Sequence, residues 1–286
     1  MTASVAVIAT FVGMLVDQSI PGWELVGGKF FTSTDWNFGV SYGALPLIAG
    51  TFVTTMLALL LAAPIGIGSA LAIVYLVPQR LKFLVSSLVA LLADVPSIVY
   101  GVWGVLTLEH WSSFSAEPFL SQLFHGHWPF SGVPRGAGIM IGSMVLAVMI
   151  LPIITAVGSD VIRTVPNEVV EGAIALGATR AQVIRKVVLP SCKSGLIGAV
   201  SLGTARALGE TIALATLLGG LSYSPMPDYL FATGSTLAAE IVKDFGGGFG
   251  LQTSVLDCLG VTLLVIVALV FLFARGIVNR NLRKFT

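Results

Sequence analysis

Several long apolar runs constrain this chain more than any other feature of its sequence. An α-helix needs roughly 20 consecutive apolar residues to cross a bilayer, and only helices and closed barrels satisfy their backbone groups there. The composition agrees, with 56% hydrophobic residues, 10% charged residues and a mean hydropathy of +0.95. We therefore predict an all-α integral membrane protein, with residues 1–286 forming a single transmembrane domain. A net charge of +1 and the lack of a basic cluster give no indication of a nucleic-acid partner.

Six spans are expected, and the first is the weakest. Residues 3–16 form a largely apolar run only about fourteen residues long, shorter than a full crossing requires, so we expect a first helix whose upstream part is missing from this numbering. No Lys or Arg precedes Lys29, which argues against a cleaved signal peptide. Residues 17–43 are expected to lie outside the spans, with Trp23 and Trp36 as interfacial anchors. The core is expected at 43–275, and the other spans at 47–77, 83–108, 137–158, 195–221 and 254–274.

Small residues recur at every fourth position in two of these spans. Residues 47–77 carry Ala62, Gly66 and Ala70 on one face, with Pro64 between them. Residues 195–221 carry a stripe made of Gly195, Ala199, Gly203 and Ala207. Small side chains let helices approach closely inside a membrane, so both faces are predicted to be helix–helix contacts.

A polar interruption of the apolar pattern at 160–190 predicts two short helices. Pro166 is suited to a first helical position, and Gly177 can end that helix with a positive φ. Thr179 begins a second helix, with Gln182 completing a capping box, and Pro190 is expected to stop it. A loop this long between spans is unusual unless something docks on it.

The distribution of positive charge predicts the orientation. If the loop at 160–190 is cytoplasmic, the inner segments hold eleven Lys and Arg residues and the outer segments hold three, so both termini are expected in the cytoplasm. The same arrangement places Cys192 and Cys258 on opposite sides of the membrane and excludes a disulfide between them. The inner residues are Arg80, Lys82, Arg163, Arg180, Arg185, Lys186, Lys193, Arg275, Arg280, Arg283 and Lys284, and the outer ones are Lys29, Arg135 and Lys243.

Asp94, Arg206 and Glu210 are the ionisable residues deepest in the predicted spans, and Arg206 is the only Lys or Arg among them. A charge at mid-helix is costly and needs a partner or a watery path. Arg206 and Glu210 are four residues apart, which predicts one helical face and an ion pair. Arg206 is interpreted either as an electrostatic ligand for an anion on a translocation path, positioned by Glu210, or as half of a structural ion pair. Asp94 would pair with Arg206 or cap the break before Pro96.

The sequence offers little for other chemistry. It has no G-x-x-x-x-G-K-[ST] nucleotide loop and no Ser/His or Cys/His arrangement within one span. His125 and His127 lack carboxylate or cysteine support, so no metal or other cofactor is expected. Any energy for uphill transport would enter through a partner docked on the polar loop.

The spacing in that loop resembles the coupling loop of ABC-importer permeases, E-A-A-x3-G-x9-I-x-L-P. The matching residues are Glu171, Gly172, Ala173, Gly177, Val187, Leu189 and Pro190, with Gly172 in place of Ala and Val187 in place of Ile. In that family the loop sits in a cleft of the cytoplasmic ATPase. The resemblance implies an ATPase-coupling segment at 160–194, and Glu168 in the first turn of its first helix is counted with the coupling residues.

The wider chain resembles the permease subunits of the bacterial phosphate-specific ABC importer, most closely the PstC type. The resemblance rests on residues 42–55, 95–104 and 147–157, on the coupling loop, and above all on ARALGET at 205–211. It implies a MetI-like permease fold in the bacterial inner membrane. By this resemblance Arg206 and Glu210 match positions linked to phosphate translocation, and Asp94 and Thr211 are counted with them as candidate residues of the substrate path. The implied partners are a second, similar permease in a heterodimer, two cytoplasmic ATPase subunits that hydrolyse the ATP, and an external phosphate-binding protein.

One position departs from that pattern, and other functions stay open. Family members often have a carboxylate where this chain has Ala90 and a small residue where it has Asp94, which leaves the role of Asp94 open. A permease for another oxyanion (molybdate, sulfate or phosphonate) is the nearest alternative. A membrane-embedded enzyme would need a catalytic constellation that the sequence lacks, and a passive channel would not need the coupling loop.

Overall fold

The computed structural model describes residues 2–132, 136–218, 223–224 and 226–282. Arg135, Arg283 and Lys284 from the charge count, and the end of the expected fifth span, lie outside these ranges. The chain forms two compact units, and each is described by itself. Unit 1 comprises 1–57, 96–146 and 208–268, and unit 2 comprises 58–95, 147–207 and 269–286.

The predicted all-α membrane architecture is confirmed. Within the described ranges, four helices are long and apolar enough to cross a bilayer, and two further helix pairs raise the number to six if each pair is one span. The four candidate spans are Ser4–Val26, Leu45–Tyr75, Ile139–Arg163 and Leu251–Gly276. The pairs are Gln79–Ala93 with Ser97–Leu123, and Arg180–Ser191 with Lys193–Leu208.

Unit 2 is built around the second half of α7 (Ile139–Arg163), which packs against α3 (Leu45–Tyr75) and α11 (Lys193–Leu208). A Cβ atom on Gly66 of α3 would lie 2.9 Å from Cγ2 of Ile154, and one on Gly203 of α11 would lie 2.8 Å from Cγ1 of the same side chain. The Thr155 hydroxyl also donates to the Gly66 carbonyl at 3.4 Å. Both predicted small-residue stripes are therefore confirmed as helix–helix contacts.

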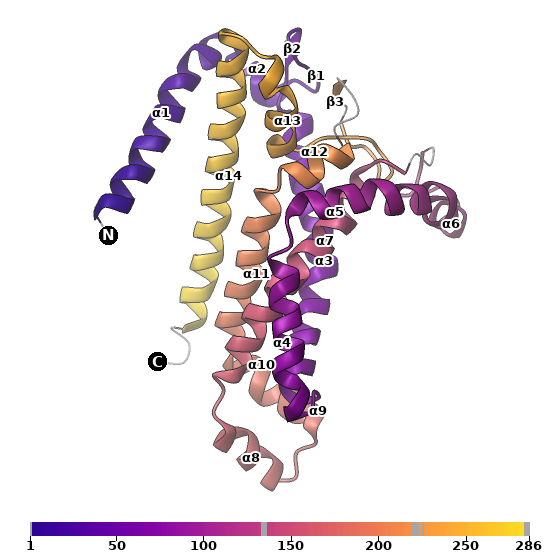
Figure 1. Ribbon diagram of the computed structural model, residues 1–286, viewed down its shortest axis with the longest axis vertical. Helices are drawn as coiled ribbons and strands as arrows, with labels where there is room; N and C mark the ends of the chain where they lie inside the picture. Colours follow the sequence, from indigo (N-terminus) through magenta and orange to yellow (C-terminus); the bar gives the residue numbers. More distant parts are fainter. Residues whose placement is uncertain (1, 133–135, 219–222, 225, 283–286) are drawn as a thin grey trace. The chain divides into compact units, whose positions relative to one another are not determined.

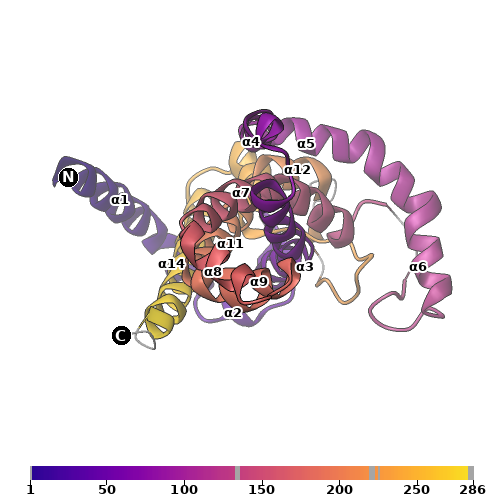
Figure 2. The same cartoon turned by 90° about the horizontal axis from the view of Figure 1, so that it is seen from below.

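Unit 2 also contains several shorter helical elements. They are α4 (Gln79–Ala93), α8 (Asn167–Ala175), α9 (Arg180–Val183), a π-helical turn (Ile184–Val188) and α10 (Leu189–Ser191). Figures 1 and 2 show α8 and α9 together beyond the first turns of α11. No residue of α4 is buried, in contrast to the close packing around α7.

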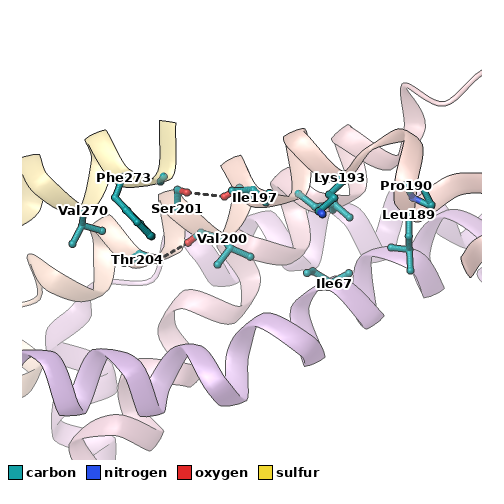
Figure 3. A pocket seen from close by; sticks show the side chains of 12 residues that line it. Ile67, Leu189, Pro190, Lys193, Ile197, Val200, Ser201, Thr204, Val270 and Phe273 are labelled. Atoms are coloured by element: carbon teal, nitrogen blue, oxygen red, sulfur yellow. Dashed lines mark hydrogen bonds between the residues drawn. The ribbon is translucent and has the colours of Figure 1, made fainter. Parts of the chain in front are cut away.

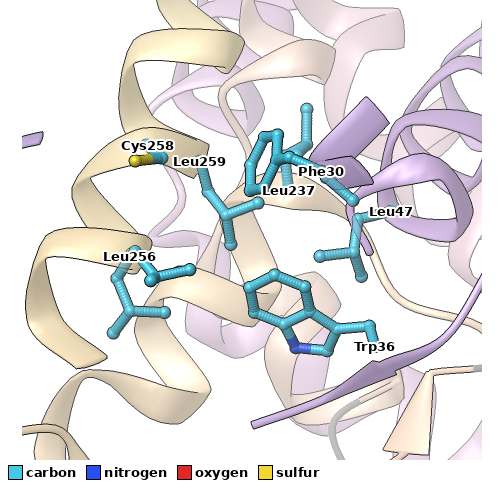
Figure 4. Close-up of a cluster of buried hydrophobic side chains, with 9 residues drawn as sticks. Phe30, Trp36, Leu47, Leu237, Leu256, Cys258 and Leu259 are labelled. Carbon is cyan, nitrogen blue, oxygen red and sulfur yellow. The ribbon is translucent and has the colours of Figure 1, made fainter. Parts of the chain in front are cut away.

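Unit 1 has a small sheet and several short helices around one apolar cluster. Strands β2 (Ser41–Tyr42), β1 (Trp36–Asn37) and β3 (Tyr223–Ser224) form an antiparallel sheet in that order, which the sequence did not predict. Figure 4 shows Trp36, Leu47, Leu237 and Leu259 in the buried cluster. The helical elements are α1 (Thr2–Val26), α2 (Lys29–Thr32), α5 (Ser97–Trp103), π-turns at Gly104–Glu109 and Ser112–Ala116, α6 (Glu117–Leu123), α12 (Ile212–Leu218), α13 (Leu237–Asp244), a 3₁₀ turn (Phe245–Gly247) and α14 (Leu251–Leu282).

The expected end of the first helix and the expected interfacial position of Trp36 were wrong. Helix α1 continues to Val26. Gly22 lets it approach α14 closely, since a Cβ there would lie 2.5 Å from the Ser254 carbonyl oxygen. Trp36 is fully buried instead of anchoring at an interface. The indole of Trp23 donates to the Ser19 hydroxyl at 3.1 Å and packs on neighbouring aromatic rings.

Two other predicted boundaries differ from the structure. The span expected at 83–108 is interrupted before Pro96. The segment from 109 to 123, which lies outside the expected spans, continues as π-turns and α6. The span expected at 195–221 ends at Leu208. Cys192 and Cys258 are both buried free thiols.

Candidate functional site

The coupling segment has the local geometry that its sequence predicts. Gly177 adopts a φ of +85°, and no atom lies within 4 Å of the position that a Cβ would occupy. Thr179 caps α9: its hydroxyl accepts from the Gln182 N–H at 3.3 Å, and the Gln182 side chain accepts from the Thr179 N–H at 2.8 Å. The two helices and the turn between them are therefore confirmed.

The roles of the two prolines were predicted less well. Pro166 is the N-cap with an extended ψ of 135°, and the first helical residue is Asn167. Pro190 does not stop the second helix, which continues to Ser191. A π-helical turn directly precedes it, and such a wide turn suits a residue that has no N–H to donate.

The coupling segment has an inner and an outer surface. Ala173 and Leu189 pack against the buried cluster that contains Val183 and Val188. Glu168, Glu171 and Gly172 are exposed on the outer surface.

Leu176, directly before Gly177, is 91% exposed and was not among the predicted site residues. The sequence feature that could have identified Leu176 is an apolar side chain at the turn of an otherwise polar segment. Exposed apolar groups beside carboxylates are typical of a protein-docking surface.

Arg206 lies in the last turn of α11 and is exposed. It follows Gly198 and Leu202 at helical spacing, and these two residues are also exposed. The neighbouring stripe, one residue further along the chain, is buried at Ala199 and Ala207. The Arg206 stripe is therefore separate from the stripe that packs on α7.

Glu210 does not share a helix with Arg206, so the prediction of one helical face was wrong. Helix α11 ends at Leu208, and Glu210 is 3% exposed in the break that follows. Its Oε1 accepts from the Ala213 N–H at 3.2 Å, and the Thr211 carbonyl accepts from the Ala215 N–H at 2.8 Å. The break has a local cause, since Gly209 is a poor helix former and a carboxylate can satisfy the first N–H groups of the next helix.

Asp94 occupies the C-cap position of α4, two residues before Pro96. Its backbone N–H donates to the Leu91 carbonyl at 3.3 Å, and its side chain is exposed. Helices commonly end one or two residues before a proline. Of the two roles predicted for Asp94, the structure supports its place at this break.

A pocket of about 670 Å³ lies along α11, bounded by Ile67 of α3 and Phe273 of α14 (Figure 3). Lys193 contributes a charge at one end. The Ser201 and Thr204 hydroxyls donate to backbone carbonyls of their own helix at 2.7 and 2.8 Å. The pocket is therefore mainly apolar, and its chemistry does not suit an oxyanion.

The predicted histidine pair shows no arrangement for a metal. Nδ1 of His127 lies 3.1 Å from the His125 carbonyl oxygen. Among the described residues, no group of three or more His, Cys, Asp or Glu side chains is placed to hold an ion.

These features define a class of protein, the membrane subunit of a transporter that couples to a docked partner. The model of the family described as "Binding-protein-dependent transport system inner membrane component" matches residues 62–285. The chain belongs to this family of ABC-importer permeases. As a permease it is a transport component of the inner membrane, and ATP hydrolysis belongs to a separate subunit.

Sequence relatives give a closer assignment. The chain is 37% identical to the phosphate transport system permease protein PstC of Mesorhizobium japonicum, over 97% of this chain and 87% of that protein. It is 38% identical to PstC of Haemophilus influenzae, over 93% of this chain and 87% of that protein. A probable ABC transporter permease of Bacillus subtilis, YqgH, is 36% identical over 98% and 87%.

Solved structures agree on the fold. The chain is similar to a subunit of a bacterial alginate ABC transporter, with a TM-score of 0.63, 16% identity and coverage of 98% of this chain and 94% of that one. It is also similar to a chain of the MetNI methionine ABC transporter, with a TM-score of 0.56, 20% identity and coverage of 83% and 94%. The MetI-like permease fold expected from the sequence is therefore confirmed.

Proposed function

We propose that this chain is the permease subunit of an ATP-driven importer of inorganic phosphate and forms half of the translocation path. The main support is the likeness to PstC permeases over nearly the whole chain, at 37% identity. The exposed Arg206 at the end of α11 supports the same conclusion, because phosphate near neutral pH carries one to two negative charges and needs compensation inside a membrane.

The proposed assembly has a second, similar permease, two cytoplasmic ATPase subunits and an external phosphate-binding protein. The ATPase would dock on the outer surface of the coupling segment, at Glu168, Glu171 and Leu176. We propose that the segment and both termini lie in the cytoplasm, which agrees with this docking and with the charge bias.

Arg206 is proposed as the electrostatic ligand of the anion on the path. Its planar guanidinium matches two oxygens of a phosphate, and its stripe faces away from the packing on α7. Glu210, buried just before α12, is proposed to position Arg206, as the sequence predicts, and to support the break after α11. The rival interpretation is a structural ion pair between the two, in which the loss of both charges together would be tolerated.

The substrate is tested by uptake into proteoliposomes that contain the complete importer and its binding protein. We expect uptake of labelled phosphate that requires internal ATP and is unaffected by excess sulfate or molybdate. Uptake of sulfate or molybdate at a comparable rate would assign the chain to another oxyanion. ATP-independent flux would favour a passive channel.

A further inference from the structure

A second cavity, of about 610 Å³, lies in unit 2 near the start of the coupling segment. Its walls come from the end of α3, the first turns of α4, the end of α7 and the beginning of α8. The polar side chains used below are Gln79, Lys82, Ser86, Arg163 and Asn167. Unlike the mainly apolar pocket along α11, this cavity is lined by two cationic and several neutral polar side chains.

Two cationic side chains, Lys82 and Arg163, line this cavity. The Lys82 ammonium donates to the Val74 carbonyl at 2.7 Å, which fixes its position and leaves further N–H groups for a ligand. The Arg163 guanidinium donates to the Ser86 hydroxyl at 3.0 Å. Asp160 lies on its other side, with a carboxylate oxygen 3.8 Å from Nη1, and is 76% exposed. Because one exposed carboxylate offsets two cations, the cavity has a positive character.

An apolar surface continues from the cavity along α4. Phe83 lines the cavity and is 84% exposed, and Leu84 and Leu88 are 55% and 51% exposed. A free inorganic anion would make no use of this surface, whereas a lipid with acyl chains would cover it.

We propose that this cavity binds the phosphate group of an anionic membrane phospholipid, with the acyl chains lying along α4. Lys82 and Arg163 neutralise the phosphate, and the Gln79 and Asn167 amides donate to its oxygens. Asn167 is the first residue of α8, so the bound lipid contacts the start of the coupling segment. This site is independent of which substrate the importer carries.

The experiment uses the complete importer in nanodiscs of phosphatidylcholine with increasing phosphatidylglycerol. Bound phosphatidylglycerol is measured by native mass spectrometry. We expect Lys82→Gln and Arg163→Gln each to weaken its retention about fivefold, and the double variant roughly twenty-five-fold. Arg80→Gln is the matched control, because Arg80 is an exposed cation of the same helix that does not line the cavity, and it should retain the lipid as wild type does.

A second variant separates lipid binding from damage to the fold. Asp160→Asn removes the carboxylate beside Arg163 and should tighten phosphatidylglycerol binding, about twofold, which a misfolded protein would not do. Equal retention in wild type and the double variant would overturn the proposal. Binding of labelled inorganic phosphate to the lipid-depleted complex, lost in the double variant, would assign the cavity to the free anion and overturn the lipid assignment as well.

Discussion

Two neighbouring stripes of α11 are offset by one residue in the sequence. One stripe is buried, and the other is exposed. Gly203 packs against Ile154 of α7 with no room for a Cβ, and Ala199 and Ala207 of the same stripe are buried. Leu202 and Arg206 are exposed, and Arg206 is the cation that the sequence places deep in a span. Within one helix, the small residues therefore account for packing, whereas the exposed stripe carries the residue that we propose as the anion ligand. Substitutions on the two stripes should separate these roles.

The largest effect is expected for Arg206→Ala. Without its guanidinium the anion crosses an apolar region uncompensated, so phosphate uptake should fall at least about 100-fold while the complex still assembles. Uptake of labelled phosphate and copurification of the ATPase measure the two outcomes. Arg206→Lys keeps the charge but loses the planar fork, and should recover part of the activity.

The Arg206→Ala, Glu210→Ala double variant decides between an anion ligand and a structural ion pair. An ion pair predicts that removal of both charges restores uptake, because neither charge is then left alone. The anion-ligand role predicts that the double variant stays inactive. Glu210→Gln alone should reduce uptake only a few-fold, since the amide oxygen can still accept from the Ala213 N–H.

The buried stripe should respond in the opposite way. Gly203→Val places methyl groups against Ile154, where a Cβ atom alone already lies 2.8 Å from Cγ1. Overpacking of this kind costs about 1–3 kcal/mol, so the thermal stability and yield of the complex should fall. Gly198→Val is the matched control, because no atom lies within 4 Å of its Cβ position. Equal losses of stability for the two variants would contradict the separation of the stripes.

A smaller loss is expected at the turn of the coupling segment. Gly177→Val forces a β-branched residue to a φ of +85°, which costs about 1–3 kcal/mol of backbone strain. Docking of the ATPase and phosphate uptake should therefore fall roughly tenfold, while insertion into the membrane is retained. Crosslinking to the ATPase and phosphate uptake are the measurements. Gly246→Ala serves as control, since Gly246 lies in open space outside this segment. Normal crosslinking and uptake in Gly177→Val would remove this turn from its proposed role.

Features that depend on neighbouring residues were predicted from the sequence better than features that depend on contacts between distant segments of the chain. The positive φ of Gly177, the capping box at Thr179 and the small-residue contacts depend on a few neighbouring residues or on helical spacing, and all were readable in the sequence. The burial of Trp36 was not, because it depends on a sheet with β3 and a cluster with α14, which lie far away in the chain. The break after Leu208 was missed although Gly209, Glu210 and Thr211 interrupt the apolar pattern there, because apolar residues resume at Ile212 and both sides were interpreted as one span.

The smallest effect is expected for Asp244, a partly buried carboxylate of unit 1. It tests whether the burial of this side chain changes the stability of the protein with pH. Burial raises the pKa of Asp244 to about 6, and the nearby charge of Glu240 adds to the shift, while Lys243 and the Trp36 indole, 3.4 Å from Oδ2, oppose it. An unfolded Asp loses its proton near pH ~4, so between pH ~4 and ~6 the folded protein binds more protons, and its stability should fall as the pH rises through that range. Asp244→Asn removes this penalty. The melting temperature of the variant should therefore exceed that of wild type by a few degrees at pH ~7, and the difference should shrink toward pH ~4. Asp228→Asn, at an exposed position, should follow wild type at every pH. A constant difference between Asp244→Asn and wild type across the whole range would show that the carboxylate does not titrate with folding.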